Sequence, residues 1–135
     1  MSRRFLLAVG VTAALAGCGS AHPTSDRDQI RDVAALVYGA LTSNHPEGAC
    51  KYALKEKDCL RGLGTVKALH ISLKDLIPDD WRTRIATAPV YVDKRRNAAS
   101  LQITSRQKNV KTFEKVNFRK VNGSWLVVEN TSNNG

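Results

Sequence analysis

The chain has 135 residues, with 21 Lys and Arg against 12 Asp and Glu and a formal net charge of +9. This length is enough for one compact domain. The sequence contains no glycine-rich phosphate loop, no metal-spaced histidines and no Ser-His-Asp order. It therefore gives no support for a nucleotide-binding protein, a metalloprotein or a serine hydrolase, and we expect neither a metal nor a cofactor.

The start of the chain has the layout of an export signal. Arg3 and Arg4 precede an uncharged, mostly apolar run over residues 5–16. A charged head, an apolar middle and small residues before a break are typical of such signals. The run is short for a membrane helix, which needs roughly 20 residues. An ordinary secretory peptide and a short membrane helix remain the alternatives.

Residues 15–18 read Leu-Ala-Gly-Cys and resemble the bacterial lipobox at all four positions. The resemblance implies diacylglyceryl transfer to the Cys18 thiol and cleavage before that residue. Residues 1–17 would then be a cleaved signal peptide and residues 18–25 a lipid-anchored tether. The mature protein would lie on the extracytoplasmic face of a bacterial membrane, exported by the general secretory or the twin-arginine route.

The expected location indicates which partners the positive charge of the chain would attract. A basic exported protein held at a membrane faces anionic headgroups and wall polymers, which attract it. Besides the membrane itself, we therefore expect an anionic envelope surface or a protein as partner. We expect no nucleic-acid partner, because an exported protein is separated from the nucleic acids of the cell. A solvated basic surface without a dedicated partner is the alternative.

Two cysteines remain once Cys18 carries lipid. Cys50 and Cys59 would both face an oxidising compartment, where paired thiols form disulfides. We therefore predict a Cys50–Cys59 disulfide, with two free buried thiols as the alternative.

The first half of the domain is predicted to be helical. Apolar residues recur at helical spacing from Asp26 to Thr42, and either Ser25 or an Asp26-x-x-Gln29 capping box begins that helix. A short second helix is expected over 46–55, followed by a polar turn at 56–58. Residues 66–77 fit a helical stripe and also a strand-like alternation. We favour the helix there and leave the strand open.

The second half is predicted to be an antiparallel meander. Strands are expected over 84–94, 98–106, 110–121 and 124–130. The Asn122-Gly123 pair between the last two is a strong hairpin signal, because a type I′ turn needs positive φ at both central residues. Alternation within the strands makes one sheet face apolar, and the N-terminal helices are the available cover.

This order of elements resembles the nuclear transport factor 2-like superfamily. The matching segments are the helix at 26–42, the short helix at Ala49-Cys50 and the closing Lys-Val-Asn-Gly-Ser-Trp-Leu-Val at 120–127. The resemblance implies one α+β domain over 26–130, with helices packed on a curved antiparallel sheet as a cone, and a polar tail at 131–135. Members include isomerases, dehydratases, polyketide cyclases and non-catalytic binding domains, so the fold does not decide the function.

A cone-type enzyme needs an acid or base in a dry pocket. The weak candidates here are His70, Asp75 and Glu114. A carboxylate at 114 would share the strand face of the apolar residues and would need a partner such as Arg84 or Tyr91. For each candidate a structural role is the favoured interpretation, so we expect no catalysis.

Two further groups of residues suggest binding. Aromatic side chains that could line a pocket at the mouth of the cone, or simply fill the core, are Trp81, Tyr91, Phe118 and Trp125. The residues that could form a basic sheet face are Lys94, Arg95, Arg96, Lys111, Lys115 and Arg119. We therefore expect a lipid-anchored envelope lipoprotein with a non-catalytic binding or accessory domain; the alternative is a lyase or isomerase acting on a small apolar ligand.

Overall fold

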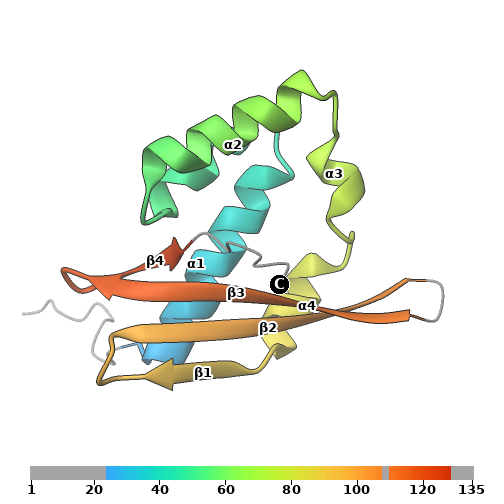
Figure 1. Cartoon of the computed structure of the whole chain (residues 1–135). Coiled ribbons are helices and arrows are strands. Elements are labelled where there is room, and N and C mark those ends of the chain that lie inside the picture. Colours follow the sequence, from blue (N-terminus) through green and yellow to red (C-terminus); the bar gives the residue numbers. More distant parts are fainter. Residues whose placement is uncertain (1–23, 108–109, 129–135) are drawn as a thin grey trace, which may run out of the picture.

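The computed structural model describes residues 24–107 and 110–128, which form an α+β fold (Figure 1). Helices come first and a four-stranded antiparallel sheet follows, as expected. The helical elements are α1 (Asp26–Leu41), the 3-10 helix η2 (Pro46–Tyr52), α2 (Glu56–Ala68), α3 (Leu73–Leu76) and α4 (Trp81–Thr87). The strands are β1 (Val90–Asp93), β2 (Ala98–Gln107), β3 (Val110–Val121) and β4 (Ser124–Val128). Cys18, the predicted signal peptide and the predicted polar tail lie outside the described residues.

Helix α1 begins where the sequence predicts, with Ser25 as its cap. The Ser25 hydroxyl accepts a hydrogen bond from the Asp28 backbone N–H at 3.2 Å, which satisfies one of the unpaired donors of the first turn. Ile30, Ala34 and Tyr38 are the buried residues of this helix. Their spacing of four residues places them on one face, and this face of α1 packs against the core.

The core lies between α1, α4 and the inner face of the sheet. Leu101 and Ile103 on β2 point inward with Phe118 on β3, and all are buried. Trp81 and Ile85 of α4 close the same core from the side. The predicted apolar sheet face is therefore confirmed, and the helices cover it.

The sheet is a simple meander in the order β1-β2-β3-β4. Asn122 and Gly123 have φ values of +50° and +82°, which confirms the predicted tight hairpin between β3 and β4. The open edge of β4 is partly covered, because the Leu54 N–H donates to the Val127 carbonyl at 2.8 Å. Covering an edge in this way removes a site for unwanted strand pairing.

The predicted strand over 84–94 is wrong in its first half. Residues 81–87 form α4, and the strand begins only at Val90. Trp81 and Ile85 are four residues apart and both buried, which is a helical pattern of burial. The Arg84 side chain also bonds Asp80 one turn earlier at 2.6 Å, and its guanidinium donates to the Thr104 carbonyl. These contacts favour a helix over an extended chain.

The helical preference over 66–77 is confirmed only in part, because residues 69–72 between α2 and α3 are not helical. Residues 56–58 are the first turn of α2 rather than a polar loop, and η2 ends at Tyr52. Helix α2 stops at Ala68, and His70 then takes a left-handed backbone conformation with φ of +55°. This break lets the chain turn back into α3.

Candidate functional site

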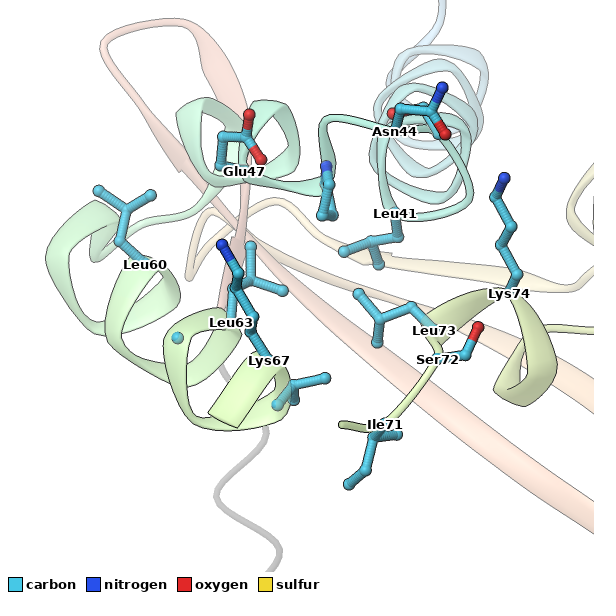
Figure 2. A pocket seen from close by; sticks show the side chains of 14 residues that line it. Leu41, Asn44, Glu47, Leu60, Leu63, Lys67, Ile71, Ser72, Leu73 and Lys74 are labelled. Atoms are coloured by element: carbon cyan, nitrogen blue, oxygen red, sulfur yellow. The ribbon is translucent and has the colours of Figure 1, made fainter. Parts of the chain in front are cut away.

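An open groove lies between the C-terminal end of α1 and the α2–α3 segment (Figure 2). Its volume is about 480 Å³, within the range of roughly 300–1,000 Å³ that small-molecule sites occupy. Apolar side chains from four elements and the loops between them make most of its wall: Leu41, Pro46, Leu60, Leu63, Val66, Ile71 and Leu73.

The groove exists because α2 does not join the core. This helix contains no buried residue, and Leu60 and Ile71 keep 43% and 42% of their surface exposed. Leu60, Leu63 and Val66 recur at a spacing of three residues, so they share one side of α2 and face the groove. An apolar surface left open in this way is typical of a binding site.

Charged groups stand at the rim. Lys67 of α2 and Lys74 of α3 both line the groove, as does Glu47 of η2 (Figure 2). The Glu47 carboxylate contacts His45 Nδ1 at 3.3 Å. Within the described part of the chain, neither lysine has an ion-pair partner. The groove therefore combines an apolar wall with two ammonium groups.

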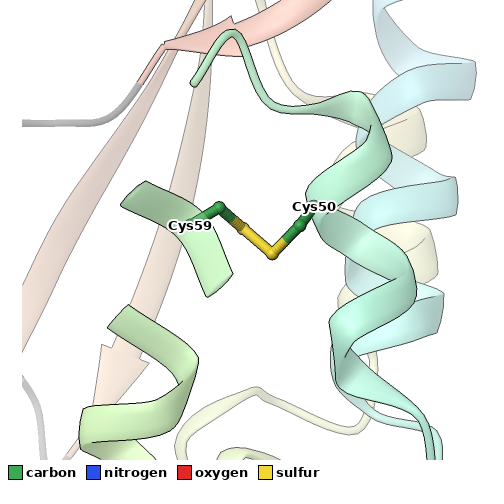
Figure 3. Close-up of a disulfide and its surroundings, with 2 residues drawn as sticks. All are labelled: Cys50 and Cys59. Atoms are coloured by element: carbon green, nitrogen blue, oxygen red, sulfur yellow. A yellow bond between two sulfur atoms is a disulfide. The ribbon is translucent and has the colours of Figure 1, made fainter. Parts of the chain in front are cut away.

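A disulfide holds α2 in place (Figure 3). Cys50 on η2 and Cys59 on α2 are bonded, with their Cα atoms 5.5 Å apart, which confirms the predicted pairing. Cys50 is buried, whereas α2 itself contacts mainly η2. The bridge is therefore the chief link between the groove wall and the core.

Removing the bridge should loosen this wall. We expect the Cys50→Ala, Cys59→Ala double variant to lose about 2–3 kcal/mol of unfolding free energy, because the disulfide closes a short loop in the unfolded chain. Urea denaturation measures the loss. Amide hydrogen exchange should rise most in α2 and least in α1. A uniform rise over the whole domain would contradict the local role of the bridge.

The predicted acid–base residues do not come together. His70 is exposed in the turn between α2 and α3, and Asp75 is exposed on α3. Glu114 lies on the inward-facing side of β3, where its hydrogen-bond partner is Tyr38 of α1 rather than Arg84 or Tyr91. None of the three lines the groove.

Tyr38 and Glu114 form a structural pair. Burial raises the pKa of the Tyr38 hydroxyl well above its usual 10.0, and the neighbouring Glu114 carboxylate raises that pKa further. The phenol therefore stays protonated and donates to the carboxylate. Glu114 itself is exposed to solvent, so the pair lies at the edge of the core.

The four aromatic residues do not share a pocket. Trp81, Phe118 and Trp125 are buried in the core, with 6%, 1% and 3% of their surface exposed. Tyr91 lies on the opposite sheet face and is 59% exposed. The expectation of an aromatic cavity at the mouth of the cone is therefore not met, because the inward-facing rings pack directly against the helices.

Trp125 has a polar partner that the sequence did not indicate. Its Nε1–H donates to Asp26 Oδ1 at 3.0 Å, and Lys120 Nζ contacts the same oxygen at 3.1 Å. These two hydrogen bonds hold the pKa of Asp26 below its usual 3.8. Asp26 thus ties the first turn of α1 to the β3–β4 hairpin instead of capping the helix.

This arrangement predicts a pH-dependent contribution to stability. A lowered folded-state pKa stabilises the fold above pH 3.8, and that stability is lost as the pH falls through the folded pKa. We expect Asp26→Asn to lower the melting temperature at neutral pH, with a gap from wild type that narrows as the solution is acidified below 3.8. Asp32→Asn, on the exposed side of α1, is the control. A gap that does not change with pH would refute this role.

The predicted basic residues fall into two places. Lys94, Arg95 and Arg96 are exposed in the turn between β1 and β2. Lys115 and Arg119 are exposed on β3, where they pair with Gln102 and Ala98 of β2. The side chain of Lys111 lies outside the described part of the structure.

The described residues contain neither a metal-binding cluster nor a membrane-spanning helix. Within residues 24–107 and 110–128, no three His, Cys, Asp or Glu side chains gather where a metal ion could bind. No helix in these ranges is both long and apolar enough to cross a bilayer.

Comparison with protein-family models, curated proteins and solved structures finds no match to this chain.

Proposed function

We propose that this protein is a lipid-anchored lipoprotein of the bacterial envelope whose domain binds an amphipathic ligand without catalysis. The ligand has an apolar chain and an anionic head, such as a carboxylate or a phosphate. The observation that carries the proposal is the open apolar groove with Lys67 and Lys74 at its rim. The Leu-Ala-Gly-Cys sequence at 15–18 supports the anchor.

The chemistry of the groove supports this class of ligand. An acyl chain that covers exposed leucine, valine and isoleucine side chains removes apolar surface from water. This stabilises the complex by about 25 cal/mol for each Å² of surface removed. A lysine ammonium group near such a wall pairs with an anionic head. Glu47 also lines the groove and lies 3.3 Å from His45 Nδ1, and the two lysines outnumber this one carboxylate, which favours an anionic head.

A relationship to the nuclear transport factor 2-like superfamily belongs to the same proposal. Its support is the order of elements, with α1 on the inner face of an antiparallel meander that ends in the Asn122-Gly123 hairpin. The non-catalytic role is favoured over the lyase or isomerase because Phe118 and Trp125 fill the interior where such enzymes hold their acid and base.

A titration of the full-length protein with a fluorescent long-chain fatty acid tests the groove. We expect Leu73→Glu to weaken binding by at least about tenfold, because it places a carboxylate on the apolar wall next to the acyl chain. Leu76→Glu is the matched control. It makes the same change on α3, at a residue that is 64% exposed and does not line the groove.

The same titration with the uncharged fatty alcohol tests the anionic head. We expect the alcohol to bind more weakly than the acid, since it cannot pair with Lys67 or Lys74. Equal loss of binding in the Leu73→Glu and Leu76→Glu proteins, or no binding by the wild type, would refute the groove as the site.

A further inference from the structure

One end of the domain brings together the entry of the chain and a basic turn. The N-terminal end of α1, the β1–β2 turn and the β3–β4 turn lie at the same end (Figure 1). The Lys120 backbone N–H donates to the Asn97 carbonyl at 2.7 Å, while its ammonium group contacts Asp26 at 3.1 Å. These bonds join the basic turn to the residue at which the tether enters the fold.

We name this surface the basic end. Its exposed cations come from α1, the β1–β2 turn and β3: Arg27, Lys94, Arg95, Arg96 and Arg119. Exposed carboxylates of the same surface lie beside cations: Asp28 is 3.9 Å from Arg31, and Asp93 is 3.7 Å from Arg96. Asp26 binds Lys120 and Trp125.

The turn keeps its cations at the surface through backbone hydrogen bonds. Asp93 Oδ1 accepts from the N–H groups of Arg95 and Arg96 at 3.1 and 3.3 Å, and the other oxygen of this carboxylate lies 3.7 Å from Arg96 Nε. Asn97 follows with φ of +50° and completes the turn. Among the described residues, Lys94 and Arg95 have no salt-bridge partner.

We propose that the basic end docks onto the anionic phospholipid headgroups of the membrane that holds the lipid on Cys18. This inference rests on the lipid anchor proposed above. Eight peptide units separate Cys18 from Asp26 and can span at most about 29 Å, so the basic end is held near the bilayer. Clustered cations are attracted to an anionic surface within about 8 Å, the screening length at physiological salt.

Docking in this way orients the groove. Helix α1 has 16 residues and is therefore about 24 Å long. The basic end lies at its N-terminus and the groove at its C-terminal end, where Leu41 forms part of the wall. The groove then stands away from the membrane surface and opens to the aqueous side.

Lysine footprinting of the full lipidated protein tests the docking. The protein is reconstituted into vesicles of phosphatidylcholine alone or of phosphatidylcholine with phosphatidylglycerol, and a water-soluble reagent acylates exposed amines. We expect acylation of Lys94 to slow by at least about threefold in the anionic vesicles. Lys67 and Lys74 should be acylated at the same rate in both. Equal acylation of Lys94 in both vesicles overturns the docking.

A pair of variants separates a local effect from net charge. Arg95→Glu with Arg96→Glu should abolish the protection of Lys94. Lys55→Glu with Lys57→Glu changes the net charge equally at the start of α2 and should leave that protection in place. Loss of protection in both pairs would overturn the proposed surface.

Flotation with phosphatidylcholine vesicles reports on the anchor alone. A protein that floats but leaves Lys94 unprotected in anionic vesicles refutes the docking and retains the lipid anchor. A protein that does not float with phosphatidylcholine vesicles refutes the anchor and the docking together.

Discussion

Replacing Cys18 by Ala should move the protein from the membrane fraction to the soluble fraction. The lipobox resemblance implies a diacylglyceryl group on the Cys18 thiol, and an anchor of two acyl chains would be stable because each buried CH₂ contributes about 0.8 kcal/mol. Without the thiol no chain can be attached. Cell fractionation with an antibody or a C-terminal tag measures the distribution.

The control for this experiment is the Cys50→Ala, Cys59→Ala protein, which lacks the disulfide and should stay with the membrane. Membranes are washed at high salt before analysis, because salt screens attraction between the basic end and anionic headgroups. A Cys18→Ala protein that remains in the washed membranes would contradict the lipid anchor.

The second large effect is expected at the centre of the core. Phe118 of β3 is 1% exposed and belongs to the core cluster between the sheet and the helices. We expect Phe118→Ala to lower the unfolding free energy by about 3–5 kcal/mol, because it removes a buried ring and leaves a cavity. That loss is a large part of the roughly 5–15 kcal/mol that holds a typical domain folded.

Tyr91→Ala is the control for the core variant. Tyr91 lies on the opposite face of the sheet and is 59% exposed, so its replacement should change the free energy by no more than about 0.5 kcal/mol. Urea denaturation of both variants gives the comparison. A similar small change in the two proteins would mean that the interior is not packed as described.

Local signals in the sequence predicted several elements well. The four-residue recurrence of Ile30 and Ala34 identifies α1, and Asn122-Gly123 identifies the closing hairpin. The Cys50–Cys59 bridge was predicted from two cysteines nine residues apart in a chain expected to be exported to an oxidising compartment. In each case the residues that decide the structure lie close together in the sequence.

Contacts between distant residues could not be predicted in this way. Asp26 meets Lys120 and Trp125 across 94 and 99 residues, and no local pattern marks that cluster. Helix α4 was missed because seven residues are too few to show a clear period, and its burial comes from the sheet that follows.

The groove was missed for a different reason. Leu60, Leu63 and Val66 recur at a helical spacing, but the predicted helix began only at residue 66, whereas α2 begins at Glu56. Periodicity does not show whether another element covers an apolar helix face. Only the fold shows that the break at His70 leaves this side of α2 open towards α1.

Photo-crosslinking is the most direct test of the proposed binding site. A photoactivatable long-chain fatty acid is bound to the full-length protein, irradiated, and its attachment sites are mapped by mass spectrometry. The proposal predicts crosslinks on groove residues such as Leu63, Ile71 and Leu73. Crosslinks concentrated on the outer sheet face around Tyr91, with none on α2 or α3, would contradict it.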